Sequence, residues 1–231
     1  MRDKPFHLRL VWRAKRAVRW LLTRFTRPTY RRSLDYLTGR DELPRLLNRR
    51  GLVGVGVEVG VRDGEFSEHL LREWQGRRLI SVDAWDEEVD RNGDHADLGQ
   101  AVIDGLYERT RSRLGRFGAR SEIVRSPSAG AAREIAPGSL DFVYIDAAHD
   151  LESVREDIAA WYPLVRPGGI IAGHDYLDGP MCGTIYGVKS AVDELCEREG
   201  LEVGVTLRDA PLRSWFVQVP DRAVDVAADA R

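Results

Sequence analysis

The stretch that decides the fold is Leu140–Tyr176, which reads LDFVYIDAAHDLESVREDIAAWYPLVRPGGIIAGHDY. Its two apolar runs predict buried strands, and the amphipathic segment between them has the length of a helix. Asp146 and His149 follow the first run. His174 and Asp175 follow the second. Because residues just past the carboxyl ends of parallel strands line the ligand crevice of an α/β sheet, we expect these four side chains to meet at one edge, where they would form an active site.

Strand and helix signals alternate on both sides of this stretch. The apolar runs at 53–59, 79–82, 122–125, 202–207 and 214–219 predict further strands, and the spacing at 64–74, 101–117, 129–135 and 187–199 predicts helices. No helical pattern separates the last two strands, so they are expected to pair antiparallel. The predicted fold is α/β, a Rossmann-like, doubly wound, seven-stranded, mainly parallel sheet with a C-terminal antiparallel hairpin strand.

Charge is distributed unevenly along the chain. Residues 1–50 contain 15 Arg and Lys against 4 Asp and Glu, although the whole chain of 231 residues has a net charge of only −2. Residues 8–25 combine an apolar stripe with arginines, which predicts a basic amphipathic helix. Such a helix can make a weak contact with an anionic membrane surface, or pack on the acidic body or on a dimer partner. We expect a basic helical N-terminal extension (1–50), a folded domain (51–220) and a flexible tail (221–231).

Several classes of protein are disfavoured by composition. The two cysteines, Cys182 and Cys196, have no metal-type spacing and form no disulfide framework. No apolar run approaches the roughly 20 residues of a membrane span, and arginines interrupt any signal-peptide pattern. Nucleic acid is not an expected partner, because the body is acidic and contains no reader motif. The sequence therefore predicts a cytoplasmic protein with a small-molecule or oligosaccharide ligand.

A glycine-rich turn follows the first strand of the folded domain. It runs from Glu58 through Gly60 to Gly64 as E-x-G-x-x-x-G, unlike the G-x-G-x-x-G of nicotinamide-binding turns. Glycine there lets the backbone approach a ligand at a helix N-terminus, and this spacing fits a nucleoside with a zwitterionic tail. Asp83 ends the next strand, where an acid can accept hydrogen bonds from ribose hydroxyls. Trp85 can then stack on adenine or pack in the core.

Together these motifs resemble the class I S-adenosylmethionine-dependent methyltransferases over about residues 51–220. The RPGGI sequence at Arg166–Ile170, expected as a turn before the fifth strand, and the closing hairpin belong to the same resemblance. The resemblance implies S-adenosyl-L-methionine as the cofactor. It places Glu58, Gly60, Gly64 and Ser67 around the methionine part, Asp83 at the ribose, and Ala84, Trp85 and Ser126 beside the adenine.

The pattern D-x-x-H, followed by H-D-Y, resembles a narrower group, the metal-dependent sugar O-methyltransferases of the macrocin and mycinamicin type. In size and motif layout the chain is also similar to the 1-O-methyltransferases of methylmannose polysaccharide assembly. The resemblance implies Asp146 and Asp175 as ligands of a divalent cation such as Mg²⁺, and His149 as general base. Where this chain has His174 the group often has a carboxylate, so this histidine is expected as a ligand, a substrate contact or a support for Asp175. Acceptor contacts are expected from Tyr176, Tyr186 and Lys189.

Two classes of function follow. The first is transfer of a methyl group to a hydroxyl of a sugar or sugar-containing product by a homodimeric enzyme. A catechol-type or other small-molecule O-methyltransferase is the alternative within that class, although catechol-type enzymes favour D-N where this chain has H-D. The second class is a non-catalytic, membrane-peripheral binding protein that acts through the basic N-terminal arm.

Overall fold

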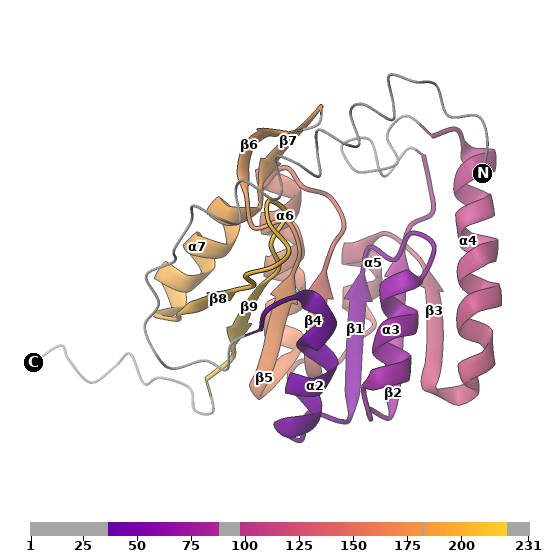
Figure 1. The fold of residues 1–231 in the computed structure, drawn as a ribbon, viewed down its shortest axis with the longest axis horizontal. Coiled ribbons are helices and arrows are strands. Elements are labelled where there is room, and N and C mark those ends of the chain that lie inside the picture. The colour runs from indigo at the N-terminus through magenta and orange to yellow at the C-terminus, as the bar shows by residue number, and fades with distance from the viewer. Residues whose placement is uncertain (1–36, 88–97, 182, 221–231) are drawn as a thin grey trace, which may run out of the picture.

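A seven-stranded sheet forms the centre of the computed structural model, which describes residues 37–87, 98–181 and 183–220 (Figure 1). Its strands lie in the order β3 (Ser121–Arg125), β2 (Arg78–Asp83), β1 (Val55–Val59), β4 (Leu140–Ile145), β5 (Val165–Gly173), β9 (Trp215–Gln218) and β8 (Val203–Val205). Strand β9 runs antiparallel to both of its neighbours, β5 on one side and β8 on the other, whereas the other pairings in this sheet are parallel. The predicted α/β sheet with a closing antiparallel hairpin is confirmed.

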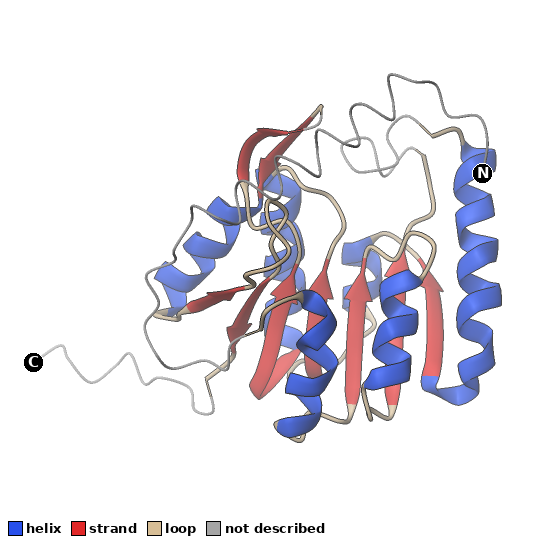
Figure 2. Ribbon diagram, viewed as in Figure 1, coloured by secondary structure: helices blue, strands red, loops and turns tan. Residues whose placement is uncertain are grey.

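Helices cover both faces of the sheet (Figure 2). The helices are α2 (Leu43–Arg49), α3 (Glu65–Glu73), α4 (Gln100–Leu114), α5 (Ser128–Arg133), α6 (Leu151–Trp161) and α7 (Val188–Glu199), with short 3-10 segments η1 (Arg40–Glu42), η2 (Gly115–Arg120) and η3 (Tyr162–Leu164). Helices α2 and α3 lie on one face, and α5, α6 and α7 lie on the other. A separate two-stranded sheet, β6 (Asp178–Met181) with β7 (Thr184–Gly187), stands above the main sheet. The sequence had not predicted this small sheet.

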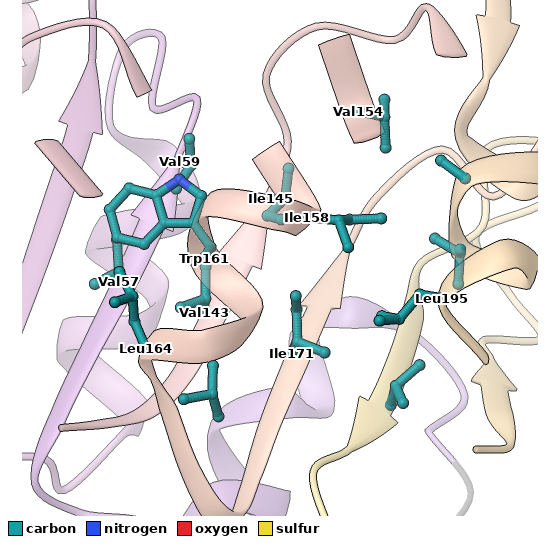
Figure 3. Packing of buried hydrophobic residues seen from close by; sticks show 14 of the residues in the cluster. Val57, Val59, Val143, Ile145, Val154, Ile158, Trp161, Leu164, Ile171 and Leu195 are labelled. Atoms are coloured by element: carbon teal, nitrogen blue, oxygen red, sulfur yellow. The ribbon is translucent and has the colours of Figure 1, made fainter. Parts of the chain in front are cut away.

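Strand β4 is buried along its whole length, as expected for a central parallel strand covered on both faces. Its residues alternate between the two cores. Val143 and Ile145 pack toward α6, where Trp161 fills the space above Val57 (Figure 3). Phe142 belongs to the other core, beside α2 and α3. This double burial fixes where β4 ends, and therefore fixes the position of the polar residues that follow it.

The RPGGI sequence was predicted as a turn before the fifth strand, and that prediction is wrong in its boundary. Arg166–Ile170 lies inside β5, where the pairing with β4 shifts register between Leu140 and Phe142. Gly168 has a φ of 74° and its amide bonds to the carbonyl of Val219. The glycines therefore form an irregularity within the strand, because the backbone on both sides still finds partners.

The N-terminal extension is described only from residue 37 onward. The predicted helix at 8–25, most of the polar loop at 86–99 and the tail at 221–231 lie outside the described residues. Leu43, Leu46 and Leu47 of α2 are almost completely buried and pack in the same core as Leu52. The described end of the extension is thus part of the domain. Within the described ranges, no helix is long and apolar enough to cross a bilayer.

Candidate active site

The loops that follow the first five strands surround a cleft of about 450 Å³. This volume is within the range of small-molecule sites. The cleft lies at the carboxyl ends of the parallel strands, as predicted. The predicted site residues that line it are Glu58, Gly60, Asp83, Ala84, Asp146, His174, Asp175 and Tyr186.

The glycine-rich turn brings two strand ends into contact. Gly60 has a φ of 86°, and a Cβ atom there would lie 2.1 Å from the carbonyl oxygen of Asp146. Only glycine fits this position, because both the left-handed backbone and the close approach exclude a side chain. Gly64, with a φ of 81°, precedes the first residue of α3. The turn therefore leaves exposed backbone and a helix N-terminus beside the cleft.

Glu58 is a buried acid at the floor of the cleft, with 2% of its surface exposed. The hydroxyl of Ser67 donates to its carboxylate and lies 2.7 Å from the hydroxyl of Ser81. Burial raises the pKa of Glu58 to about 8, although the Ser67 hydrogen bond opposes this shift. Ser67 itself is fully buried and therefore supports Glu58 from behind.

Asp83 is fixed by backbone amides. Its Oδ2 accepts hydrogen bonds from the amides of Val61 (2.9 Å) and Arg62 (2.8 Å), and its Oδ1 accepts one from the amide of Trp85 (2.8 Å). A carboxylate has about four acceptor positions, so the group retains capacity for one more donor. This geometry is compatible with the predicted ribose contact, which stays a prediction.

Two residues predicted beside adenine, Trp85 and Ser126, do not line the described cleft. The indole of Trp85 is 1% exposed, packs with Ile103 and Leu106, and donates to the carbonyl of Arg62 at 2.8 Å. This placement favours the alternative that Trp85 packs in the core. Ser126 is also not among the residues lining the described cleft, whereas the three residues after it are.

Asp146, His149 and Asp175 form a compact cluster after β4 and β5. One ligand atom from each side chain lies within 4.8 Å of those of the other two. His149 Nε2 lies 2.9 Å from Asp175 Oδ2, and His174 Nδ1 lies 2.8 Å from Asp175 Oδ1. His174 Nδ1 is 3.8 Å from Asp146 Oδ1, so it lies between the two acids. Carboxylate oxygens with a nearby imidazole suit Mg²⁺ or Mn²⁺, and this donor set fits the predicted cation.

The electrostatics of the cluster favour an ionised Asp175. Burial raises the pKa of Asp175, but hydrogen bonds from His149 and His174 outweigh burial and hold it well below its usual range. Burial lowers the pKa of His174, yet its bond to Asp175 and the charge of Asp146 raise it overall. Asp175 therefore keeps a negative charge at a buried position, where a divalent cation would compensate it.

His149 is held from two sides. Its ring stacks on Tyr186 at 4.9 Å between centroids, and Asp175 bonds to its Nε2. Asp150 follows it and accepts the amide hydrogen bond of Ser153, so Asp150 caps α6. Asp146 is thus not the residue that caps this helix.

Tyr176 and Lys189 form a separate cluster with Asp193. The hydroxyl of Tyr176 and the ammonium of Lys189 both donate to Asp193, and the ammonium lies 5.6 Å from the Tyr176 ring centre. Neither side chain is among the residues lining the described cleft, whereas Tyr186 is. Their predicted contact with the acceptor stays a prediction.

Residues that sequence reasoning missed also line the cleft. Arg40, from η1, donates from Nη1 to Asp146 Oδ2 at 3.1 Å. Asp157, on α6, is 7% exposed and accepts a hydrogen bond from Ser128, whose Oγ in turn accepts the indole N–H of Trp161 at 2.8 Å. Arg40 is one of many arginines near the N-terminus, and Asp157 occupies one of several acidic positions on its helix, so neither had a distinguishing signal.

A sheet with one antiparallel strand, together with a cleft at the carboxyl ends of its parallel strands, defines a Rossmann-like methyltransferase fold. Residues 57–176, just over half of the chain, match the family described as methyltransferase domain. The chain therefore belongs to this methyltransferase family. No curated protein sequence matches the chain.

Solved structures support the same fold. An O-methyltransferase from Bacillus cereus in complex with SAH has 17% identity and a TM-score of 0.54, and the match covers 94% of this chain and 92% of that one. The O-methyltransferase TomG from Streptomyces achromogenes, in complex with SAM, has 18% identity and a TM-score of 0.55, with 78% and 79% covered. A putative rRNA-methylase from Clostridium thermocellum has 12% identity and a TM-score of 0.56, with 82% and 100% covered. At these identities the likeness establishes the fold alone.

Proposed function

We propose that this chain transfers the methyl group of S-adenosylmethionine to a hydroxyl of a sugar or sugar-containing product, with the help of a divalent cation. The observation that carries the proposal is the cluster of Asp146, His149 and Asp175, of which Asp146 and Asp175 line the cleft. Support for the donor comes from the methyltransferase family and from two neighbours that are described in complex with SAH or SAM. Both of these neighbours are described as O-methyltransferases.

The donor would lie across the ends of β1 and β2. Gly60 allows close approach of the cofactor to the backbone, Asp83 accepts from the ribose, and Glu58 accepts from the ammonium group of the methionine tail. Glu58 lines the cleft and, as an acid, suits this cationic part. This orientation directs the methionine end toward Asp146 and Asp175, where an acceptor hydroxyl would be aligned.

The acceptor hydroxyl must lose a proton as the methyl group is transferred. A divalent cation, when bound, would hold acceptor oxygens and lower the pKa of the hydroxyl. Asp146 and Asp175 are the residues that would hold it. His149 receives the proton, and the carboxylate of Asp175 at its Nε2 stabilises the imidazolium that results.

The choice of a sugar over a catechol rests on the residues after β5. The chain has His174-Asp175 there and D-x-x-H at 146–149, which resembles the pattern of the sugar-modifying group except that this group often has a carboxylate in place of His174. A catechol-type or other small-molecule O-methyltransferase is the alternative within the same chemistry.

The direct test is methyl transfer from labelled S-adenosylmethionine to panels of sugars and catechols, with and without a chelator. We expect transfer to sugar hydroxyls, its loss in chelator and its recovery with Mg²⁺. Full activity in chelator would show that the reaction needs no divalent cation. Transfer confined to catechols would show that a sugar is not the acceptor. Asp146→Asn should lose Mn²⁺ binding, whereas Asp104→Asn, on exposed α4, should retain it.

A further inference from the structure

Arg40 reaches the cleft from a segment that precedes the residues matching the methyltransferase family. Its Nη1 lies 3.1 Å from Asp146 Oδ2, and its guanidinium carbon lies 5.0 Å from the centre of the Phe66 ring. An aromatic face at this distance stabilises a cation and orients the guanidinium plane. The positive charge of Arg40 is therefore directed at the part of the cleft that contains Asp146.

The segment around Arg40 is anchored to the loop between β8 and β9. The amide of Arg40 donates to Asp209 Oδ2 at 2.8 Å. The carbonyl of Thr38 accepts hydrogen bonds from the amides of Leu207 (3.2 Å) and Arg208 (2.6 Å). The Thr38 amide and hydroxyl both donate to Glu42, at 2.8 Å and 2.7 Å. These bonds fix the backbone of Arg40, so its side chain extends into the cleft from a segment that hydrogen bonds hold in place.

The methionine tail of the proposed donor carries an ammonium group and a carboxylate. Glu58 suits the ammonium, but the carboxylate needs a positive partner. Arg40 and Arg62 are the arginines that line the described cleft. The amide of Arg62 bonds to Asp83, on the proposed ribose side. Arg40 interacts electrostatically with both Glu58 and Asp146, on the side of the tail.

We propose that Arg40 binds the α-carboxylate of S-adenosylmethionine. In doing so it exchanges its ion pair with Asp146 for a charge-assisted pair with the cofactor, and a guanidinium can hold a carboxylate through two parallel hydrogen bonds. The exchange also frees Asp146 Oδ2 for the divalent cation. Cofactor binding and completion of the cation site are thereby linked through one side chain. The inference rests on the proposed function for the identity of the donor.

The test compares two non-reactive ligands that differ only in the carboxylate, S-adenosylhomocysteine and S-adenosyl-3-thiopropylamine. Their dissociation constants are measured by titration calorimetry on the full chain in one Mg²⁺ buffer. We expect the wild type to favour S-adenosylhomocysteine by about 10- to 100-fold, the range for a hydrogen bond between charged groups. Arg40→Ala should remove this preference, by weakening S-adenosylhomocysteine alone. Arg62→Ala is the matched control and should keep the preference.

Three outcomes would overturn the inference. Equal weakening of both ligands by Arg40→Ala would mean that the arginine only supports the fold of the cleft. An unchanged preference would mean that the carboxylate binds elsewhere, and loss of the preference in Arg62→Ala alone would assign it to that arginine. In all three cases the wild type still binds S-adenosylhomocysteine, so the proposed function survives. If the wild type did not bind S-adenosylhomocysteine at all, the assignment of S-adenosylmethionine as the methyl donor would itself be wrong.

Discussion

His149 Nε2 lies 2.9 Å from Asp175 Oδ2, and the two side chains are only 5% and 6% exposed. A buried carboxylate beside an imidazole selects one tautomer and stabilises the protonated ring. The other oxygen of this carboxylate, Oδ1, lies 2.8 Å from Nδ1 of His174. Asp175 therefore orients both histidines, and only His149 has the ring stacking on Tyr186 that fixes its plane.

His149→Ala should lower turnover by about 10²- to 10⁴-fold, the usual contribution of a general base. The affinity for S-adenosylhomocysteine should stay within about twofold, because His149 is not among the residues lining the described cleft. Steady-state kinetics and calorimetry measure the two effects.

The same variant separates the role of a base from that of a metal ligand. Mn²⁺ affinity, followed by electron paramagnetic resonance, should persist in His149→Ala and be lost in Asp146→Asn. If His149→Ala also loses Mn²⁺, the histidine is a ligand and its assignment as base is wrong.

Glu58 makes cofactor binding dependent on pH. Burial raises the pKa of Glu58 to about 8, so the carboxyl group is mostly protonated at neutral pH. An ammonium group bound beside it favours the ionised form, so binding lowers this pKa and releases a proton. Affinity for S-adenosylhomocysteine should therefore rise between about pH 6 and pH 8, by at most tenfold per pH unit.

Calorimetry across this range, in buffers of different ionisation enthalpy, measures both the affinity and the released proton. Glu58→Gln should flatten the dependence. Glu65→Gln is the control, since Glu65 lines the cleft but is largely exposed. An equal pH slope in the wild type and in Glu58→Gln would show that another group titrates.

The sequence could predict the meeting of Asp146 and Asp175 because their strands are neighbours. Ile145 and Gly173 pair across β4 and β5, so the residues that follow them must emerge side by side. Each apolar run marks where its buried strand ends, so the residues that follow could be placed at the same edge of the sheet. The meeting of Asp146 and Asp175 could therefore be predicted without any knowledge of side-chain positions.

The sequence could not predict the contacts that depend on distant segments or on unusual backbone angles. Arg40 meets Asp146 across 106 positions of sequence, and no local pattern marks it among its neighbours. Trp85 follows a strand end, as a ligand-stacking residue would, but its φ of 44° is part of a turn that ends with the indole in the core. Left-handed backbone in a residue other than glycine has no clear sequence signal.

Gly60→Ala tests the close approach of the two strand ends. The added methyl group would lie 2.1 Å from a backbone oxygen, and the φ of 86° adds strain. We expect a loss of at least about 2 kcal/mol in the free energy of unfolding, together with loss of S-adenosylhomocysteine binding. Gly99→Ala is the control, because nothing lies within 4 Å of its added Cβ and its φ is −64°. Denaturant unfolding that finds both variants equally stable would contradict the close approach.

The raised pKa of Asp157 leads us to expect that the stability of the protein, rather than its catalysis, depends on pH. Burial raises the pKa of this carboxyl to about 6 from its usual 3.8, against the hydrogen bond from Ser128. Between these two values the folded chain binds more protons than the unfolded chain, so stability falls as pH rises from about 4 to 6 and stays lower above.

Asp157→Asn keeps an acceptor for Ser128 and removes the titration. It should therefore be more stable than the wild type at pH 8, by at most about 3 kcal/mol, and should lose this advantage near pH 4. Thermal unfolding at both pH values measures this, with the exposed Glu134→Gln as the control that should show no such crossover. A variant that is less stable than the wild type at pH 8 would contradict this prediction. It would mean that Asp157 is ionised and paired in the folded protein, and that it gives the cleft a negative charge.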